Sequence, residues 1–238
     1  PIGIGAGPAG LFCTFCLAKN GYKPILFERG EKIEQRVKTV EDLWQNNNFV
    51  SNSNVQFGEG GAGTFSDGKL NTLVKDKAGR MREVFKIFVE CGASEEIMYD
   101  SKPHIGTDIL RKVVINLREK IISMGGEIHY NSCLEDIIVE NNKIKSVIVS
   151  GKCIDTDVLV LAIGHSARDT FKMLNNKKIY MEAKPFAVGI RIIHPQKMIN
   201  ENQYPINYLF LPSASYKLTY KSKSGRGVYS FCMCPGGY

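Results

Sequence analysis

The sequence lacks a hydrophobic run long enough to cross a membrane, and it lacks a recognisable metal-binding pattern. No apolar stretch approaches the roughly 20 residues that a membrane-spanning helix needs, so we expect no membrane partner. Its seven cysteines are scattered, without histidines at the spacing of zinc ligands, so we expect no metal site. An odd number of thiols without a disulfide pattern is typical of a reducing compartment, which predicts a cytoplasmic protein.

Acidic residues are scarce in the last part of the chain. Residues 171–238 carry ten Lys and Arg but two Asp and Glu, whereas residues 1–170 are nearly balanced at 21 and 22. One interpretation is a solvated face that contacts acidic parts of a longer chain. The other is attraction of a phosphate-bearing substrate, NADPH or nucleic acid. Because no stretch is a low-complexity basic arm, nucleic acid is the less favoured partner.

The chain also lacks an initiating methionine. It begins with Pro1 within an apparent strand and stops at "CMCPGGY", just after an apolar run and a turn signal. We therefore expect an N-terminal fragment, whose partner is the remaining C-terminal part of the same chain.

What is present at the start is a glycine loop between a strand and a helix. The segment "PIGIGAGPAG" places Gly5, Gly7 and Gly10 in a G-x-G-x-x-G pattern, directly after a short apolar strand. The first glycine permits a tight turn, the second lets a pyrophosphate approach the backbone, and the third lets helix and strand pack closely. Pro8 suits the first turn of a helix, and Gly21 suits the position after its end.

A carboxylate completes this pattern. "PILFE" at 24–28 predicts a second strand that ends in Glu28, 18 residues after Gly10, where it can accept both ribose hydroxyls. Strand, loop, helix, strand and acid together predict a dinucleotide-binding site, with the phosphates at the positive end of the helix.

The rest of the chain departs from a plain NAD-binding domain. A glycine-rich stretch, "FGEGGAGTFSDGKL" at 57–70, precedes helix-forming segments at about 78–92 and 103–126. Three strand-like runs follow at 127–131, 135–141 and 143–150, and "DVLVLAIGHSA" at 157–167 predicts a buried strand that ends in small residues. Such a cluster of hairpins disfavours a simple NAD-binding regulatory module.

These motifs resemble a known family. The glycine loop, Glu28-Arg29-Gly30, the three-stranded insertion and "LVLAIG" resemble the FAD domain of glutathione-reductase-type flavoproteins. "GEGGAGTFSDGKL", "KPHIGTDIL", "LAIGHSARDTF", "KPFAVGIRIIHPQ" and "YSFCMCPGG" more closely resemble the uncharacterised FAD-dependent, or NAD(FAD)-utilising, dehydrogenases. The resemblance implies an α/β fold: a Rossmann-like FAD-binding domain, with a parallel sheet and a three-stranded β-meander, and the start of a strand-rich substrate domain. We expect the FAD domain at 1–170, with an irregular or helical excursion at about 76–102, and the partial substrate domain at 171–238.

The resemblance also implies which residues hold FAD. It implies that the glycine loop binds the pyrophosphate, that Glu28 binds the ribose and that Arg29 borders the adenine. It also implies that the backbone of Leu134 contacts the adenine and that a small-residue strand end lies against the FAD. By chain order the cofactor residues so implied are Gly5, Gly7, Pro8, Ala9, Gly10, Glu28, Arg29, Leu134, Ala162, Ile163 and Gly164. Two departures are Thr14, where an alanine is usual, and the absence of a closing glycine-rich strand–helix segment.

Other candidates come from the chemistry of the residues. Arg36 is placed to neutralise a phosphate; the alternative is a solvated arginine paired with Glu34 or Glu41. The backbone N–H groups of Gly61, Ala62, Gly63 and Thr64 are candidates for an anion-binding nest or for facing the flavin ring. Asp67-Gly68 is an equally good signal for a plain hairpin tip.

Hydride transfer leaves negative charge at one edge of the flavin, so a nearby donor or cation is needed. Lys69 and His104 are the catalytic candidates for that role, whereas "CMC" at 232–234 is interpreted as buried cysteines rather than a redox pair. We therefore expect an FAD-dependent oxidoreductase that transfers a hydride between an organic substrate and flavin, with NAD(P)H as a candidate electron donor. The alternative is an FAD-containing nucleic-acid-modifying or RNA-binding protein that uses the basic C-terminal region.

Overall fold

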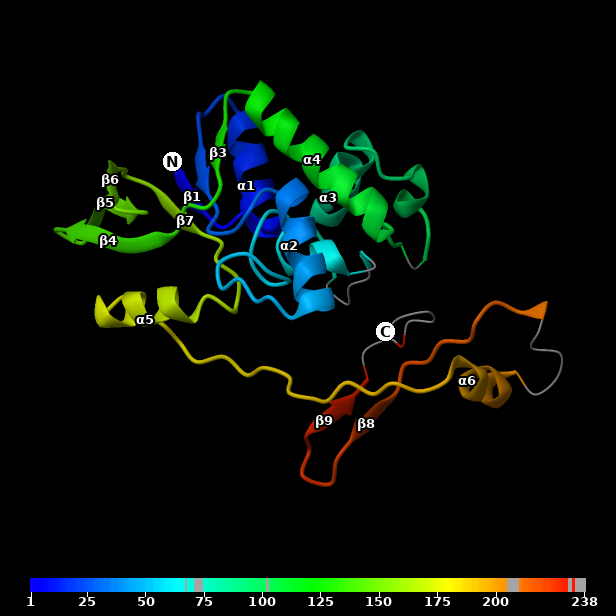
Figure 1. The fold of residues 1–238 in the computed structure, drawn as a ribbon. Helices are drawn as coiled ribbons and strands as arrows, with labels where there is room; N and C mark the ends of the chain where they lie inside the picture. The colour runs from blue at the N-terminus through cyan, green and yellow to red at the C-terminus, as the bar shows by residue number, and fades with distance from the viewer. Residues whose placement is uncertain (67, 71–74, 102, 205–209, 231–232, 234–238) are drawn as a thin grey trace. The chain divides into compact units, whose positions relative to one another are not determined.

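The structure, a computed structural model, describes residues 1–66, 68–70, 75–101, 103–204, 210–230 and 233. The chain divides into two compact units, Pro1–Met181 and Glu182–Tyr238 (Figure 1). The division falls after Met181 rather than after residue 170, because helix α5 (Arg168–Asn176) contacts strand β4 of the first unit.

A four-stranded parallel sheet organises the first unit. Its order is β3-β2-β1-β7, where the strands are β1 (Ile2–Ile4), β2 (Ile25–Phe27), β3 (Glu127–His129) and β7 (Leu159–Leu161). Ile2 of the central strand lies opposite Ile25 on one side and Leu159 on the other. The predicted strand–turn–helix–strand unit is therefore confirmed, and the chain leaves β1 toward β2 but returns beside β1 as β7.

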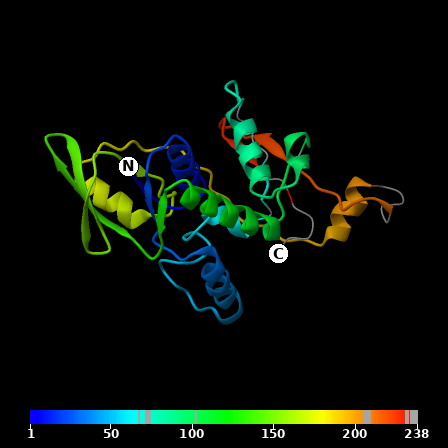
Figure 2. The same ribbon diagram turned by 90° about the horizontal axis from the view of Figure 1, so that it is seen from above.

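Helix α1 (Pro8–Lys19) follows the glycine loop and carries part of the core. Pro8 opens the helix and Gly21, at φ +82°, follows its end, as predicted. Leu11 and Phe15 are buried in one hydrophobic cluster with Leu117 and Ile121 of α4 (Thr107–Ser123). The two helices contact each other and lie side by side in both views (Figures 1 and 2). The core therefore fixes the helix whose first turn borders the glycine loop.

Helical segments between β2 and α4 add to the same core, because Ile33, Ile87 and Ile97 are buried in the cluster that holds Leu11. The chain forms α2 (Ile33–Asn46), a 3-10 turn η1 (Ala62–Phe65), α3 (Arg80–Glu90) and a second 3-10 turn η2 (Glu95–Met98). The first of the two expected helical segments, at about 78–92, is confirmed as α3, and the second, at 103–126, is confirmed as α4.

The three-stranded sheet differs in composition from the prediction. It is antiparallel and consists of β4 (Leu134–Glu140), β5 (Lys143–Val149) and β6 (Lys152–Asp155). Strands β4 and β5 are joined by a turn at Asn141-Asn142, with φ of +51° and +59° as a type I′ hairpin requires. The run at 127–131 does not belong to this sheet. It forms β3, which follows the crossover helix α4 and pairs in parallel with β2. The missed third strand lies after a tight turn at Ser150-Gly151.

The second unit has little regular structure among its described residues. It contains α6 (Gln196–Gln203) and a hairpin of β8 (Thr219–Lys221) and β9 (Gly227–Tyr229). Residues 182–194 are without helix or strand. The described part of this unit is therefore less rich in strands than expected.

Across the described ranges of both units, no helix has the length and apolar character needed to cross a membrane.

Candidate cofactor-binding site

The glycine loop has the close contacts that the pattern predicts. Gly5 has φ +97°, and a Cβ there would stand 2.5 Å from the carbonyl oxygen of Ala162. A Cβ on Gly10 would overlap the carbonyl oxygen of Gly5, so the helix begins in direct contact with the loop. Glycine is therefore required at both positions, one by backbone conformation and one by space.

Glu28 lies beneath this loop at the end of β2. Its side chain is buried, with 4% of the residue exposed. Oε2 accepts a hydrogen bond from the Ala6 N–H at 2.6 Å, while Oε1 accepts from Gly30 at 2.9 Å and from Gly58 at 3.0 Å. A carboxylate has about four acceptor sites, so this arrangement leaves about one for a ribose hydroxyl rather than the two that were expected.

A pocket opens where these elements meet. Strand β1 lies between β2 and β7 in the sheet, and the pocket lies at the carboxyl ends of these strands, beside the point where the strand order reverses. Parallel sheets bind ligands at such switch points. The lining residues are Ile4, Gly5, Glu28, Arg29, Phe57, Leu134, Ile163 and Thr170. Five of the eight, Gly5, Glu28, Arg29, Leu134 and Ile163, are among the predicted cofactor residues.

Three lining residues were missed by sequence reasoning. Ile4 lies in the strand before the glycine loop, and an apolar strand residue gave no reason to assign it to a pocket. Phe57 comes from a loop and Thr170 from the first turn of α5, and only the tertiary structure brings the two to the pocket. The sequence placed both residues next to predicted cofactor segments: Phe57 is the first residue of the glycine-rich stretch, and Thr170 is the last residue of "GHSARDT".

Arg29 forms one wall of the pocket. Its guanidinium donates to Asp169 at 2.8 Å and to Thr170 at 3.2 Å. It also lies 4.7 Å from the centroid of the Phe57 ring. These contacts join the end of β2 to the first turn of α5 across the pocket rim.

The second glycine-rich stretch lies directly against the first. Gly60 donates its N–H to the Ala6 carbonyl at 2.8 Å. A Cβ on Gly61, which has φ +69°, would stand 3.0 Å from the Cα of Gly7. The contact therefore supports the prediction that this stretch borders the cofactor site.

The predicted nest within that stretch is not formed. The N–H groups of Gly61 and Thr64 donate to the carbonyls of Gly58 and Gly61, and Thr64 is buried. Ala62 and Gly63 are exposed, and a Cβ on Gly63 would meet nothing within 4 Å. Gly68 has φ +66°, which agrees with a turn at this point, but Asp67 lies outside the described residues.

Both interpretations of Arg36 are wrong. The residue is fully buried, so it is not solvated, and Glu34 pairs with Arg118 instead. Its guanidinium donates to the carbonyls of Asn54, Glu59 and Gly61 at 2.7 to 3.0 Å, which leaves it no surface for a phosphate. Burial lowers the pKa of Arg36 to about 10. It therefore acts as a clamp on the 54–64 loop.

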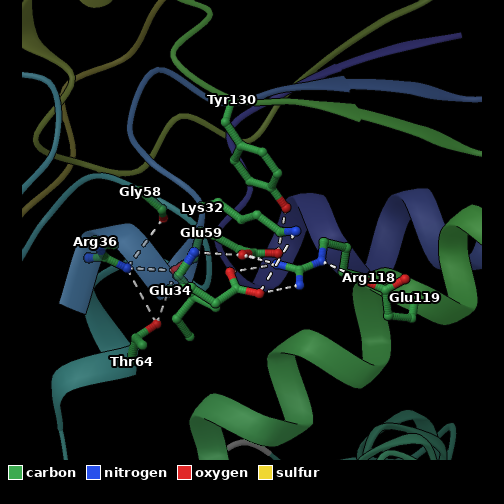
Figure 3. A network of polar contacts seen from close by, with 10 residues as sticks. Lys32, Glu34, Arg36, Gly58, Glu59, Thr64, Arg118, Glu119 and Tyr130 are labelled. Atoms are coloured by element: carbon green, nitrogen blue, oxygen red, sulfur yellow. Dashed lines mark hydrogen bonds and ion pairs between the residues drawn. The ribbon is translucent and has the colours of Figure 1, made fainter. Parts of the chain in front are cut away.

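A buried ionic network lies beside this clamp (Figure 3). Oε2 of Glu59 accepts from Arg118 at 2.7 Å and from the Ile33 N–H at 2.8 Å, and Oε1 accepts from the Tyr130 hydroxyl. Arg118 also pairs with Glu34 at 2.7 Å and with Glu119 at 3.0 Å. Sequence reasoning had no signal for this network, because its members come from four separate segments.

The environment shifts the ionisation of the network. Burial raises the pKa of Glu59, and the Tyr130 hydrogen bond opposes that rise. Burial and the charge of Glu59 raise the pKa of Tyr130. Burial lowers the pKa of Arg118, but its hydrogen bond to Glu34 and the charge of Glu59 outweigh burial, so its pKa is raised overall. At neutral pH Arg118 is thus a permanent cation between carboxyl groups.

The two catalytic candidates are neighbours. Lys69 and His104 face each other in an isolated antiparallel bridge, and both residues are exposed. The flanking backbone bonds, Ile105 N–H to Gly68 O and Leu70 N–H to Pro103 O, are both 2.9 Å. Sequence reasoning proposed each separately, whereas the fold places them together. Within the described ranges, no group of three or more His, Cys, Asp or Glu residues gathers as a metal site.

Comparison with known proteins agrees with this geometry. Residues 4–69 match the family model of the NAD(P)-binding Rossmann-like domain, and residues 185–238 match that of the FAD-dependent protein, C-terminal domain-like. An uncharacterised protein of Clostridium beijerinckii is 53% identical over 240 residues, which cover 100% of this chain and 45% of that relative. The chain thus spans about half the length of that relative.

A solved structure shares the fold. The L-proline dehydrogenase from P. horikoshii is similar to this chain with a TM-score of 0.50 and 16% sequence identity. The similarity covers 74% of this chain and 55% of that one. The matches together indicate a Rossmann-like dinucleotide-binding fold in the first part of the chain, and a segment at 185–238 that is similar to the C-terminal domain of FAD-dependent proteins.

Proposed function

We propose that this chain is the FAD-binding part of an oxidoreductase that transfers a hydride between an organic substrate and flavin. The more specific proposal is an NAD(FAD)-utilising dehydrogenase within the glutathione-reductase-type superfamily. The observation that carries the proposal is the pocket at the carboxyl ends of β1, β2 and β7, bordered by Gly5 and Glu28.

The first turn of α1 fits a pyrophosphate. Helix α1 has no acidic residue in its first turn and no side-chain cap, and its residue Pro8 has no N–H to satisfy. The N–H groups of Ala9 and Gly10 therefore stand at the positive end of the helix, where an anion is favoured. We assign the phosphates to Gly7, Pro8, Ala9 and Gly10, with Gly61 covering the loop.

The pocket fits the adenosine half. Glu28 retains about one acceptor site for a ribose hydroxyl, and Arg29 and Phe57 form a flat wall beside it. Leu134 contributes the start of β4 to the same pocket. The residues that follow β7, Ala162, Ile163 and Gly164, would lie along the remainder of the cofactor.

Bound FAD supplies the two-electron chemistry, and the chain's own residues orient it and balance charge. Lys69 and His104 are proposed for charge balance, because a cation or donor favours the anionic edge of a reduced flavin. Their shared bridge holds the two side chains on one local ladder, which supports a joint role.

The visible spectrum of the full-length protein tests the proposal. We expect flavin absorption that survives gel filtration, and anaerobic bleaching by NADH or NADPH if a nicotinamide is the electron donor. A protein that stays colourless after incubation with FAD, while folded by circular dichroism, would contradict the proposal. Retained colour without bleaching by either nucleotide would leave FAD binding in place and remove NAD(P)H as the donor.

A further inference from the structure

Glu59 is a buried carboxylate that lies between two parts of the site. It belongs to the glycine-rich loop, and 0% of the residue is exposed. A carboxylate without solvent contact is costly unless it is paired and hydrogen-bonded. Here its two oxygens accept three bonds from three different segments: the start of α2, the middle of α4, and Tyr130 after β3 (Figure 3).

The residues on either side of Glu59 contact the cofactor loops. Gly58 donates its N–H to Glu28, the proposed ribose ligand, at 3.0 Å. Gly60 donates to the Ala6 carbonyl at 2.8 Å. Any displacement of residue 59 must therefore move at least one of these neighbours, because the three residues are consecutive in the chain.

We propose that Glu59 is a positioning residue for the dinucleotide: its carboxylate fixes the 58–61 turn against the glycine loop and so sets the affinity of the site. The inference rests on the proposed binding of FAD. It assigns Glu59 no contact with the cofactor, because the residue is fully buried among Arg118, Ile33 and Tyr130 and does not line the pocket.

A buried ion pair fixes the orientation of its side chains more than it stabilises the fold. Replacing such a pair by apolar residues is often neutral or stabilising, so the pair by itself does not account for the fold. Three donors aimed at two oxygens allow few orientations of the side chain, whereas an apolar side chain in the same space could slide. This directional constraint is the property that a cofactor cradle needs.

The test compares FAD affinity with folding in the full-length protein. Glu59→Gln keeps the shape but places an N–H₂ group against one of the three donors. We expect FAD to bind about tenfold more weakly or worse, because hydrogen bonds to charged groups are among the stronger ones. Glu34→Gln is the matched control: it removes another partner of Arg118, half exposed and outside the loop, and should leave affinity within about twofold.

Two further measurements separate positioning from general destabilisation. Tyr130→Phe removes a single hydrogen bond to Glu59 and should weaken FAD by a smaller factor, even if Glu59→Gln does not fold. Hydrogen exchange of the apoprotein should accelerate in the 58–66 segment of either variant while α4 and β1 keep their protection, a local pattern that global destabilisation does not give.

The outcomes are distinguishable. If wild-type protein binds no FAD, the proposed function fails and this inference fails with it. If wild-type protein binds FAD and the folded Glu59→Gln and Tyr130→Phe variants bind it equally well, the positioning role alone is overturned. Equal weakening by Glu34→Gln would also overturn it, because Arg118 rather than Glu59 would then be the controlling group.

Discussion

The Cα of Gly7 and the position that a Cβ on Gly61 would take are 3.0 Å apart, so the two glycine-rich segments touch at their glycines. This contact is tighter than nearly all real Cβ contacts, and its neighbours are the backbone of Gly7 and the ring of Pro8. The first glycine loop is therefore covered by the second, and both would shape the phosphate site that we propose.

Substitution at Gly61 is expected to impair FAD binding. Gly61→Ala combines that contact with φ +69° and ψ −164°, a conformation that is essentially restricted to glycine and costs an L-residue about 1–3 kcal/mol. The matched control is Gly63→Ala, because Gly63 lacks a positive φ and has open space around it. Isothermal titration with FAD should show weaker binding for the first variant and near wild-type binding for the second. Equal affinities in both variants would mean that the contact does not shape the site.

Glu28→Gln is expected to weaken FAD by about ten- to a hundred-fold, since a hydrogen bond to a charged group contributes roughly 1.5–3 kcal/mol. The variant should also unfold at a lower temperature, because Glu28 accepts bonds from Ala6 and Gly58 in the absence of ligand. Glu127→Gln, an exposed change at the start of β3, serves as the control. Unchanged FAD affinity of the apoprotein would remove Glu28 from the site.

The local parts of this site were predictable from the sequence, and the long-range parts were not. Spacing in the sequence was enough to predict the roles of Gly5, Gly10 and Glu28, because the strand, loop and helix that position them are adjacent in the chain. The true third strand of the meander was missed because the 127–131 run and the meander have similar β propensity, and only the crossover by α4 assigns the first to the parallel sheet.

Arg36 illustrates the same limit for side chains. Its sequence neighbours suggested exposure, yet the loop at 54–64 folds over it and supplies carbonyl partners. No local pattern encodes which loop will cover a helix face. Likewise Glu59 reads as one polar residue in a glycine-rich stretch, and its burial follows only from Arg118 and Tyr130 arriving from distant segments.

The Arg29–Asp169 pair is expected to affect the pocket more than the fold. Burial raises the pKa of Asp169, but the hydrogen bond from Arg29 outweighs it and holds the pKa below 3.8. The pair's contribution to stability is therefore complete above about pH 4 and is lost as pH falls through the lowered pKa. At neutral pH Asp169→Asn should change stability by less than about 1 kcal/mol, since Asp169 is largely exposed.

In the same variant we expect faster FAD release, because Arg29 loses one of the contacts that hold it over Phe57. Lys145→Gln, which breaks an exposed pair with Glu140 outside the pocket, is the control for charge alone. Stopped-flow dissociation rates that match in both variants would exclude Arg29 orientation as a factor in retention.

Thiol reactivity should follow burial. Cys91 is 1% exposed and burial raises the pKa of its thiol, so we expect it to resist iodoacetamide at pH 8 until the protein unfolds. Cys16 and Cys153 are exposed and should be alkylated first. Cys13 and Cys16 are free thiols at C-x-x-C spacing within α1. The "CMC" cysteines, Cys232 and Cys234, lie outside the described residues. Peptide mass mapping that finds Cys91 modified as early as Cys16 would contradict the packing of α3 against α4.

The Lys69–His104 bridge gives the sharpest test of the proposed chemistry. Lys69→Met should leave FAD bound but slow its reduction, because loss of one charge-stabilising donor typically raises a barrier by about 2.7–4 kcal/mol. His104→Gln keeps a hydrogen-bond donor on the same ladder and should slow reduction less. If the two act together, the double variant should lose less than the product of the single losses, since groups that act as a unit are not additive. The measurement is anaerobic stopped-flow reduction, followed by the loss of visible flavin absorption, with Lys75→Met as a control for loss of charge near by. Reduction of Lys69→Met at the wild-type rate would show that the bridge shapes the loop at 68–70 and has no part in hydride transfer.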